Sequence, residues 1–125
     1  MIQQVEITLR PHARGFHLVT EEIVRQLPPL PQTGLSINEN CDPDVRDDME
    51  QIFNRLIRER ESWYTHTLEG WDDMPAHAKS IMIGVSLSVP VTRGQLNLGT
   101  WQGIYLCEFR NHGGPRRIVA TIIGE

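Results

Sequence analysis

Residues 64–79 read Y-T-H-T-L-E-G-W-D-D-M-P-A-H-A-K, and residues 99–110 read G-T-W-Q-G-I-Y-L-C-E-F-R. Between the two blocks lie strand-like segments. Asp73 can cap a helix over residues 74–83, and Gly84 can close that helix. The two blocks therefore predict a helix that passes directly into a β-rich C-terminal half.

Working outward, the other segments predict further short strands and helices. Apolar and polar residues alternate from Val5 to Leu9, which is typical of a half-buried strand. Asp42 and Pro43 form a good N-cap and first-turn pair for a helix with apolar residues at helical spacing. The sequence N-H-G-G-P between two strand-like segments predicts a hairpin. Strands are expected at residues 5–9, 34–38, 86–91, 96–98, 104–110 and 116–123, a turn at 92–94, and helices at 20–27, capped by Thr20, and at 43–58.

Length and composition predict one domain over residues 1–125. With 39% hydrophobic and 22% charged residues, the chain can bury an ordinary globular core. The order of elements predicts an α+β fold with a largely antiparallel or mixed β-sheet core and about two to three helices.

Charge and cysteine usage exclude some classes of function. Twelve basic and 16 acidic residues give a net charge of -4, which argues against sequence-blind nucleic-acid binding. We find no apolar run long enough for a membrane span and no apolar signal region after Met1. Cys41 and Cys107 form neither a metal-type pair nor a dense disulfide framework, so we expect free thiols and a cytoplasmic protein.

The block at residues 64–79 gathers two imidazoles and three carboxylates around a glycine and a proline. Neutral imidazoles bind divalent metals, and catalytic zinc commonly has three protein ligands and one open position. His66 and His77 could supply two ligands, with Glu69 or Asp73 as a third. A structural role for each histidine competes with this interpretation. Asp73 can equally be a helix cap, which leaves Asp72 free to face a pocket and bind Mg²⁺ with phosphate oxygens.

Other polar and aromatic residues are candidates for substrate binding or proton transfer. Glu108 alternates with apolar residues on one strand face; if it is buried, its pKa should rise, which suits proton transfer. Trp101 can stack on a heteroaromatic ring, although a core or interface position is the commoner reason for a tryptophan. The polar run Asn38, Glu39 and Asn40 can bind a substrate or simply satisfy a strand-to-helix turn.

Four stretches of the chain resemble the YjbQ-like family, whose members are described as secondary thiamine-phosphate synthases. They are S-I-N-E-N-C-D-P-D-V-R-D-D-M-E at 36–50, residues 64–80, residues 94–110 and the closing G-G-P-R-R-I-V-A-T-I-I-G-E at 113–125. The resemblance implies an α+β fold, a homotrimer and weak thiamine-phosphate synthase activity on a small phosphorylated or heterocyclic substrate. That reaction would need a cation to take the charge of a leaving pyrophosphate, and Lys79 and Arg110 are the nearest candidates in sequence.

One departure from the family pattern leads to a second hypothesis. Family members usually carry H-T-S-A-S-L just before the I-N-E-N block, whereas here a segment between Pro31 and Leu35 is missing, histidine included. The first hypothesis is an enzyme whose catalytic residues lie at a subunit boundary and whose cofactor is a divalent metal ion, Mg²⁺ or Zn²⁺. The second is a non-catalytic oligomer that binds a ligand or metal. The catalytic set of the first hypothesis is His66, Glu69, Asp72, His77 and Glu108.

Overall fold

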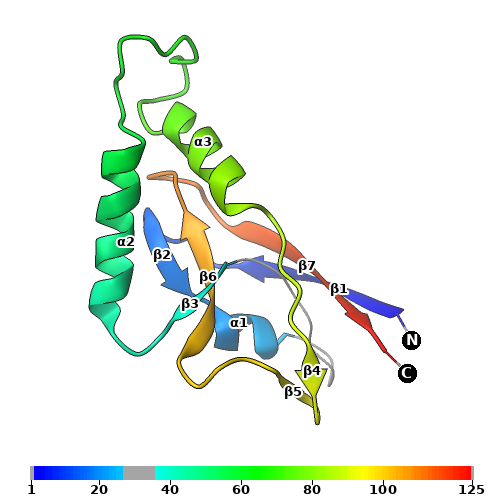
Figure 1. Ribbon diagram of the computed structural model, residues 1–125. Coiled ribbons are helices and arrows are strands. Elements are labelled where there is room, and N and C mark those ends of the chain that lie inside the picture. Colours follow the sequence, from blue (N-terminus) through cyan, green and yellow to red (C-terminus); the bar gives the residue numbers. More distant parts are fainter. Residues whose placement is uncertain (1, 27–35, 125) are drawn as a thin grey trace.

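The computed structural model describes residues 2–26 and 36–124 (Figure 1). It is an α+β fold with antiparallel strand pairs and three helices among these residues, as predicted. The strands are β1 (Ile2–Leu9), β2 (Gly15–Leu18), β3 (Ser36–Glu39), β4 (Val91–Thr92), β5 (Gln95–Leu96), β6 (Gln102–Glu108) and β7 (Arg116–Ile123); the helices are α1 (Thr20–Val24), α2 (Pro43–Leu56) and α3 (Asp73–Ile83).

Strand β6 is the centre of the molecule, because both of its edges are paired. It lies between β2 and β3 in an antiparallel three-stranded sheet. Five of its seven residues are buried. A core of Ile7, Leu9, Val19, Ile23, Ile104, Leu106, Ile118 and Ala120 joins this sheet to β1, β7 and α1.

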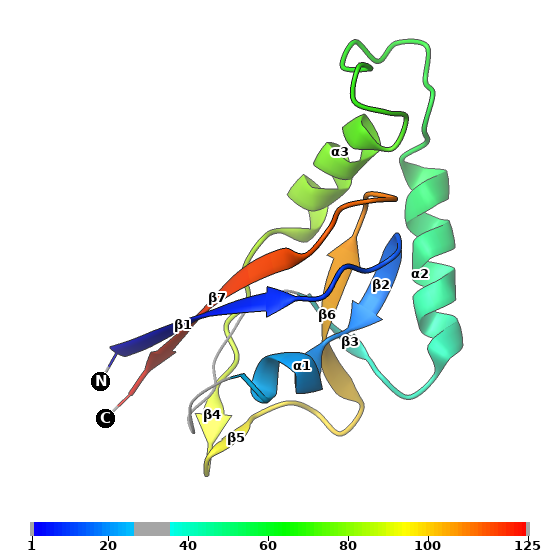
Figure 2. The same cartoon turned by 180° about the vertical axis from the view of Figure 1, so that it is seen from behind.

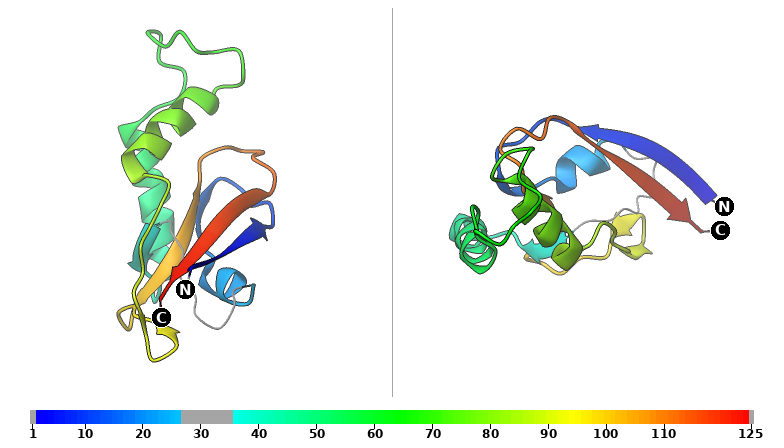
Figure 3. Two further views of the ribbon diagram at one scale, coloured as in Figure 1. Left: turned by 90° about the vertical axis from the view of Figure 1, so that its right-hand side faces the viewer. Right: turned by 90° about the horizontal axis from the view of Figure 1, so that it is seen from above.

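Strands β1 and β7 form a separate two-stranded ribbon that projects from the body (Figures 2 and 3). All eight residues of each strand are paired, from Ile2 opposite Ile123 to Leu9 opposite Arg116. The predicted hairpin between the last two strands is therefore wrong, because β6 and β7 pair with different strands. The loop between them is closed instead by side chains, since Arg116 binds Glu108.

The two longer helices follow their local sequence signals. The Asp42 side chain accepts a hydrogen bond from the Asp44 backbone amide at 2.9 Å, which confirms the predicted cap of α2. Helix α3 ends at Gly84, whose φ of 89° is one that glycine adopts without strain. Helix α2 buries Phe53 but leaves the apolar Ile52 and Leu56 exposed.

The structure corrects several predicted boundaries. The sequence did not predict strand β2, and of the predicted strand at 86–91 only Val91 lies in a strand of the described chain. Thr20 does not cap α1; its hydroxyl accepts a hydrogen bond from the Ile104 amide instead. The predicted end of that helix at Leu27 lies outside the described residues. No helix in residues 2–26 and 36–124 has the length and hydropathy needed to cross a membrane.

Candidate functional site

The candidate site lies where the loop 57–72 enters α3, close to the end of β6 and the chain just after it. This loop projects beyond the ends of α2 and α3 (Figures 1 and 3). Gly70 turns the chain toward the helix with a φ of 103°, and its carbonyl accepts a hydrogen bond from the Asp73 amide at 3.3 Å. Asp73 is then the first residue of α3, and His77 follows one turn later on the same side.

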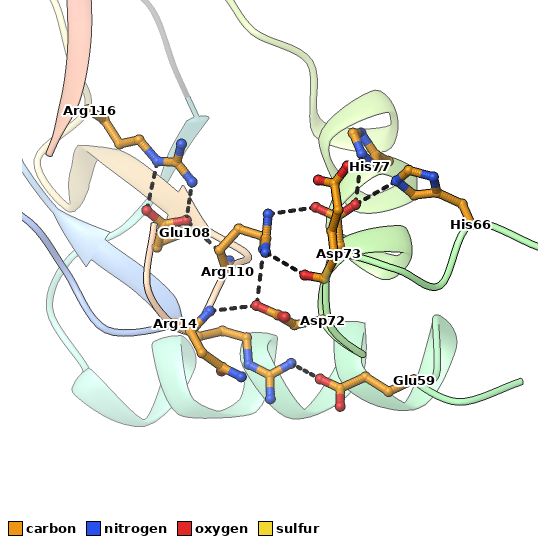
Figure 4. Close-up of polar contacts among 11 residues, drawn as sticks. Arg14, Glu59, His66, Asp72, Asp73, His77, Glu108, Arg110 and Arg116 are labelled. Carbon is orange, nitrogen blue, oxygen red and sulfur yellow. Dashed lines mark hydrogen bonds and ion pairs between the residues drawn. The ribbon is translucent and has the colours of Figure 1, made fainter. Parts of the chain in front are cut away.

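Two histidines converge on one carboxylate oxygen at this position. The Nε2 atom of His66 lies 2.7 Å from Oδ2 of Asp73, and the Nε2 atom of His77 lies 3.2 Å from the same oxygen (Figure 4). We call these three residues the Asp73 cluster. The carboxylate is buried, whereas the side chains of His66 and His77 are 45% and 59% exposed. The cluster therefore has a buried carboxylate on its inner side and two imidazoles that face the solvent.

Arg110 holds the cluster from the opposite side. Its Nη1 donates to Oδ1 of Asp73 at 2.5 Å, its Nε donates to Oδ2 of Asp72 at 3.1 Å, and its Nη2 donates to the Glu69 carbonyl at 3.1 Å. The Asn111 amide also donates to Asp72, at 2.8 Å. Arg110 thus ties the end of β6 to the start of α3 and compensates two adjacent carboxylates.

These contacts decide the ionisation of the two aspartates. Burial alone would raise the pKa of Asp72, but the Asn111 amide and the Arg110 guanidinium outweigh it and lower that pKa. For Asp73, burial is again opposed, by the His66 hydrogen bond and the Arg110 charge, and the pKa is lowered. Both groups are therefore held as carboxylates. The predicted Asp73 cap is wrong, because Asp72 occupies the N-cap position and makes no capping hydrogen bond. The Asp73 carboxylate instead contacts His66 and His77.

Glu108 is buried, as its place in the strand pattern suggested, but it is paired. Arg116 donates to both of its carboxylate oxygens at 2.8 Å, and the Arg110 amide adds a third bond. Burial would raise the pKa of Glu108, yet these hydrogen bonds lower it below the usual value. The expected raised pKa, and with it the physical argument for proton transfer, is therefore wrong.

Lys79 lies away from the opening of the cluster. Its side chain is buried, donates to Oδ1 of Asn54 at 2.8 Å and lies over the ring of Phe109. Burial lowers its pKa. Lys79 therefore connects α3 to α2 and to the chain after β6, and its amine is enclosed by protein in this chain.

The remaining candidates sit at the other end of β6. Trp101 precedes β6, and Asn38, Glu39 and Asn40 lie at the end of β3 beside it. Groups of these residues are hydrogen-bonded to β6: the side-chain amide of Asn40 donates to the Gln102 carbonyl, and the Tyr105 hydroxyl donates to the Glu39 carbonyl. A seven-residue strand spans roughly 20 Å. Within one chain, these residues and the Asp73 cluster are therefore apart.

Two cavities flank the cluster on different faces of α3. One, of about 330 Å³, is lined by Asp73 and His77 together with Arg116 and Arg117. The other, of about 460 Å³, is lined by His66 with aromatic and aliphatic side chains from the loop 57–72, α2 and α3. Sequence reasoning missed Arg116 and Arg117, although the doubled arginine at a strand start was a visible signal. It also missed the adjacent aromatic residues Trp63 and Tyr64 at the start of the histidine block.

The fold and the cluster together define a small α+β protein with a histidine–carboxylate cluster beside the end of its central strand. The family model described as UPF0047 protein YjbQ-like matches residues 5–125, and the chain belongs to this family. The resemblance of the four sequence stretches to that family is thereby confirmed.

Two known relatives align over the whole chain. UPF0047 protein YjbQ of Escherichia coli O157:H7 is 48% identical over 139 aligned positions, covering 100% of both chains. The protein of the same name from Salmonella typhimurium is 50% identical with the same coverage. These alignments are 14 positions longer than this 125-residue chain, which fits a missing segment. The predicted gap between Pro31 and Leu35 lies outside the described residues.

Solved structures support the fold. A YjbQ/UPF0047-family protein of Clostridium acetobutylicum is 28% identical, with a TM-score of 0.76 over 94% of this chain and 99% of that one. A YbjQ-like protein of unknown function from Sulfolobus solfataricus has a TM-score of 0.81 over 100% and 99% of the two chains. At 20% identity, the second structure shows a shared fold only.

Proposed function

We propose that the Asp73 cluster binds a divalent metal ion, and that the ion serves a weak thiamine-phosphate synthase-like reaction. The observation that carries the proposal is the meeting of two imidazole nitrogens at one buried carboxylate oxygen. The three residues can offer ligand atoms that all lie within 4.8 Å of one another. Asp73 is buried whereas both histidines are exposed, so a bound ion could take a further ligand from the solvent side.

The donor set fits zinc better than magnesium. Ligand atoms around a tetrahedral zinc, with bonds of about 2.0 to 2.1 Å, lie roughly 3.3 Å apart. The His77 contact of 3.2 Å already has this spacing, and His66 at 2.7 Å would have to move out slightly. Magnesium prefers an all-oxygen shell, which two imidazoles do not provide. The Arg110 bond to Asp73 would orient the ligating carboxylate from behind.

A phosphorylated substrate fits the arginine-lined cavity beside His77. Arg117 is 75% exposed, and its contact to Glu6 is a loose 3.7 Å, so its charge is available to an anion. Arg116 presents a second guanidinium, although Glu108 holds it. A zinc ion in the cluster would supply a charge for a leaving phosphate or pyrophosphate oxygen. Lys79, enclosed against Asn54, is not needed for this role.

Zinc binding is the direct test. Purified protein stripped with a chelator should bind one zinc ion per chain in a calorimetric titration. His66→Ala and His77→Ala should each weaken binding at least tenfold, because each removes one of three ligands. His112→Ala, which removes an exposed histidine outside the cluster, is the matched control. Equal affinity in all four proteins would end the metal proposal.

Activity separates the two functional hypotheses. If the cluster is catalytic, thiamine-phosphate synthase turnover should require zinc and should fall at least tenfold in the His66 and His77 variants. A protein that binds zinc at one ion per chain but forms no thiamine phosphate, with or without the ion, would be the non-catalytic binding protein. The 14 unmatched alignment positions are the observation that favours this second outcome.

We also propose that the chain self-associates, because α2 and the end of α3 carry exposed apolar side chains. Ile52 and Leu56 are exposed on α2, and Ile81, Met82 and Val85 are exposed at the end of α3 and just beyond it. Patches of this kind mark association surfaces. The family resemblance makes a homotrimer the expected assembly, and sedimentation equilibrium measures it directly. A mass equal to one chain across the micromolar range would contradict it.

A further inference from the structure

The larger of the two cavities beside the Asp73 cluster has a composition of its own. Trp63 and Tyr64 contribute aromatic rings from the loop 57–72, and Leu56, Ile57, Met74 and Ala78 contribute aliphatic surface from α2, its end and α3. His66 belongs both to this lining and to the Asp73 cluster. We call it the Trp63 cavity. Any molecule seated in it therefore lies next to a cluster imidazole.

The size and lining of the Trp63 cavity match a small-molecule site. Its volume of about 460 Å³ falls within the range of pockets that hold small ligands, which are largely apolar with a few polar groups. The polar members of the lining are Arg58, Glu61, Thr65 and His66. A site of this kind gains affinity from ring stacking and shape, and orientation from the polar groups at one side.

The aromatic pair is held in place before any ligand arrives. The Tyr64 hydroxyl donates to the Arg58 carbonyl at 2.6 Å, which closes the loop on the end of α2. Trp63 packs edge-on against Tyr64, with ring centroids 4.6 Å apart and planes at 76°. Trp63 nevertheless stays 73% exposed. Its indole face is therefore positioned by a neighbour and still open to a partner.

From these observations we infer that the Trp63 cavity binds the planar aromatic ring of a small ligand, with the ring stacked on Trp63 and its substituent directed to His66. The inference rests on the proposed function in one respect, which is that the Asp73 cluster is where the bound molecule reacts. The arginine-lined cavity on the His77 side then takes the anionic end of a ligand, and the cluster lies between the two ends.

A single-tryptophan protein tests this inference. The chain contains three tryptophans, so Trp71→Phe combined with Trp101→Phe leaves Trp63 as the only reporter. Thiamine and a simple aminopyrimidine are the ring probes, and inorganic pyrophosphate is the ring-free probe. Saturable quenching of Trp63 fluorescence by at least one ring probe, and none by pyrophosphate, is expected. Absence of quenching by both ring probes at millimolar concentration would overturn the inference.

Affinity measured without fluorescence provides the second arm. In equilibrium dialysis, Trp63→Ala should bind the quenching ring probe at least tenfold more weakly, while Trp63→Phe should restore most of the affinity. Trp71→Ala, which removes an exposed tryptophan that does not line the Trp63 cavity, should bind as the unchanged protein does. Equal weakening by Trp63→Ala and Trp71→Ala would refute a specific cavity.

Two further measurements distinguish ring binding from zinc binding and from self-association. Zinc titration of Trp63→Ala should give an unchanged affinity, so that loss of ring binding with intact zinc binding, or the reverse, assigns each failure to its own site. Sedimentation of the same variant should show an unchanged assembly. A variant that dissociates and has lost no ring affinity would show that the cavity holds a neighbouring copy instead of a ligand.

Discussion

Arg110 and Asp73 form the contact on which the candidate site is built: the guanidinium takes one carboxylate oxygen and leaves the other to the two histidines. The arginine comes from just after β6 and the aspartate from the first turn of α3. The contact therefore joins sheet and helix, and it also sets the direction in which Asp73 faces the imidazoles.

Removing this contact should damage metal binding while the histidines stay in place. We predict that Arg110→Gln weakens zinc binding by about 10- to 100-fold, the usual cost of losing a residue that orients a metal ligand. Calorimetric titration measures it. Arg55→Gln, an exposed arginine of α2, is the control and should leave the affinity unchanged. If both variants bind zinc equally well, the carboxylate does not depend on Arg110 for its orientation.

The ion pair between the buried Glu108 and the partly exposed Arg116 should contribute to acid stability. Because the folded-state pKa of Glu108 is lowered, its ionised form contributes stability that is present above the unfolded-state pKa of about 4.3 and is lost as pH falls through the folded value. Urea unfolding at a series of pH values should show this decline.

Breaking the same pair should be costly at neutral pH. Arg116→Ala leaves a buried carboxylate without its partner, and we expect it to lower the free energy of unfolding by about 3 kcal/mol. Arg117→Ala, whose partner Glu6 is on the surface, should cost less than about 1 kcal/mol. Urea unfolding at pH 7 compares the two. Similar losses would mean that burial of Glu108 does not set the cost.

Lys79 should prove dispensable for binding and chemistry. Lys79→Met replaces the buried amine by a shorter, uncharged side chain and removes one hydrogen bond to the half-buried Asn54, so stability should change by no more than about 3 kcal/mol. Zinc affinity and turnover should match those of the unchanged protein. A tenfold loss of turnover in a stable Lys79→Met protein would return this lysine to the site.

Metal should stabilise the folded protein in proportion to its affinity. At a free zinc concentration 100 times the dissociation constant, binding adds about 2.7 kcal/mol to the free energy of unfolding. The melting temperature should rise with zinc and fall after chelation, and the shift should shrink on acidification because protons compete for the ligands. At the same zinc concentration, a tenfold weaker site in His77→Ala should add only about 1.4 kcal/mol, so its melting temperature should rise about half as much.

Local sequence signals predicted those elements whose ends are set locally. The pair Asp42 and Pro43 starts α2, and Gly84 ends α3, because caps and positive φ angles are properties of a few neighbouring residues. The hairpin prediction was wrong because partner choice is not local. The final strand pairs with β1, at the opposite end of the chain, and no turn motif records that.

The site was predictable as a composition but not as an arrangement. The histidine block brings His66, Asp73 and His77 together, which agrees with Asp73 as a partner of the histidines and not with the alternative prediction of a cap. The charge state of Glu108 could not be read from its strand, because it depends on Arg116 reaching back across a loop. Alternation predicts which side chains are buried, and only tertiary contacts decide whether a buried charge has a partner.

The three groups of the Asp73 cluster do not share one element: two sit on α3, whereas His66 comes from the projecting loop 57–72. An ion bound by all three residues would cross-link that loop to α3. The susceptibility of the loop to limited proteolysis then becomes a gauge of occupancy, readable on a gel without any substrate.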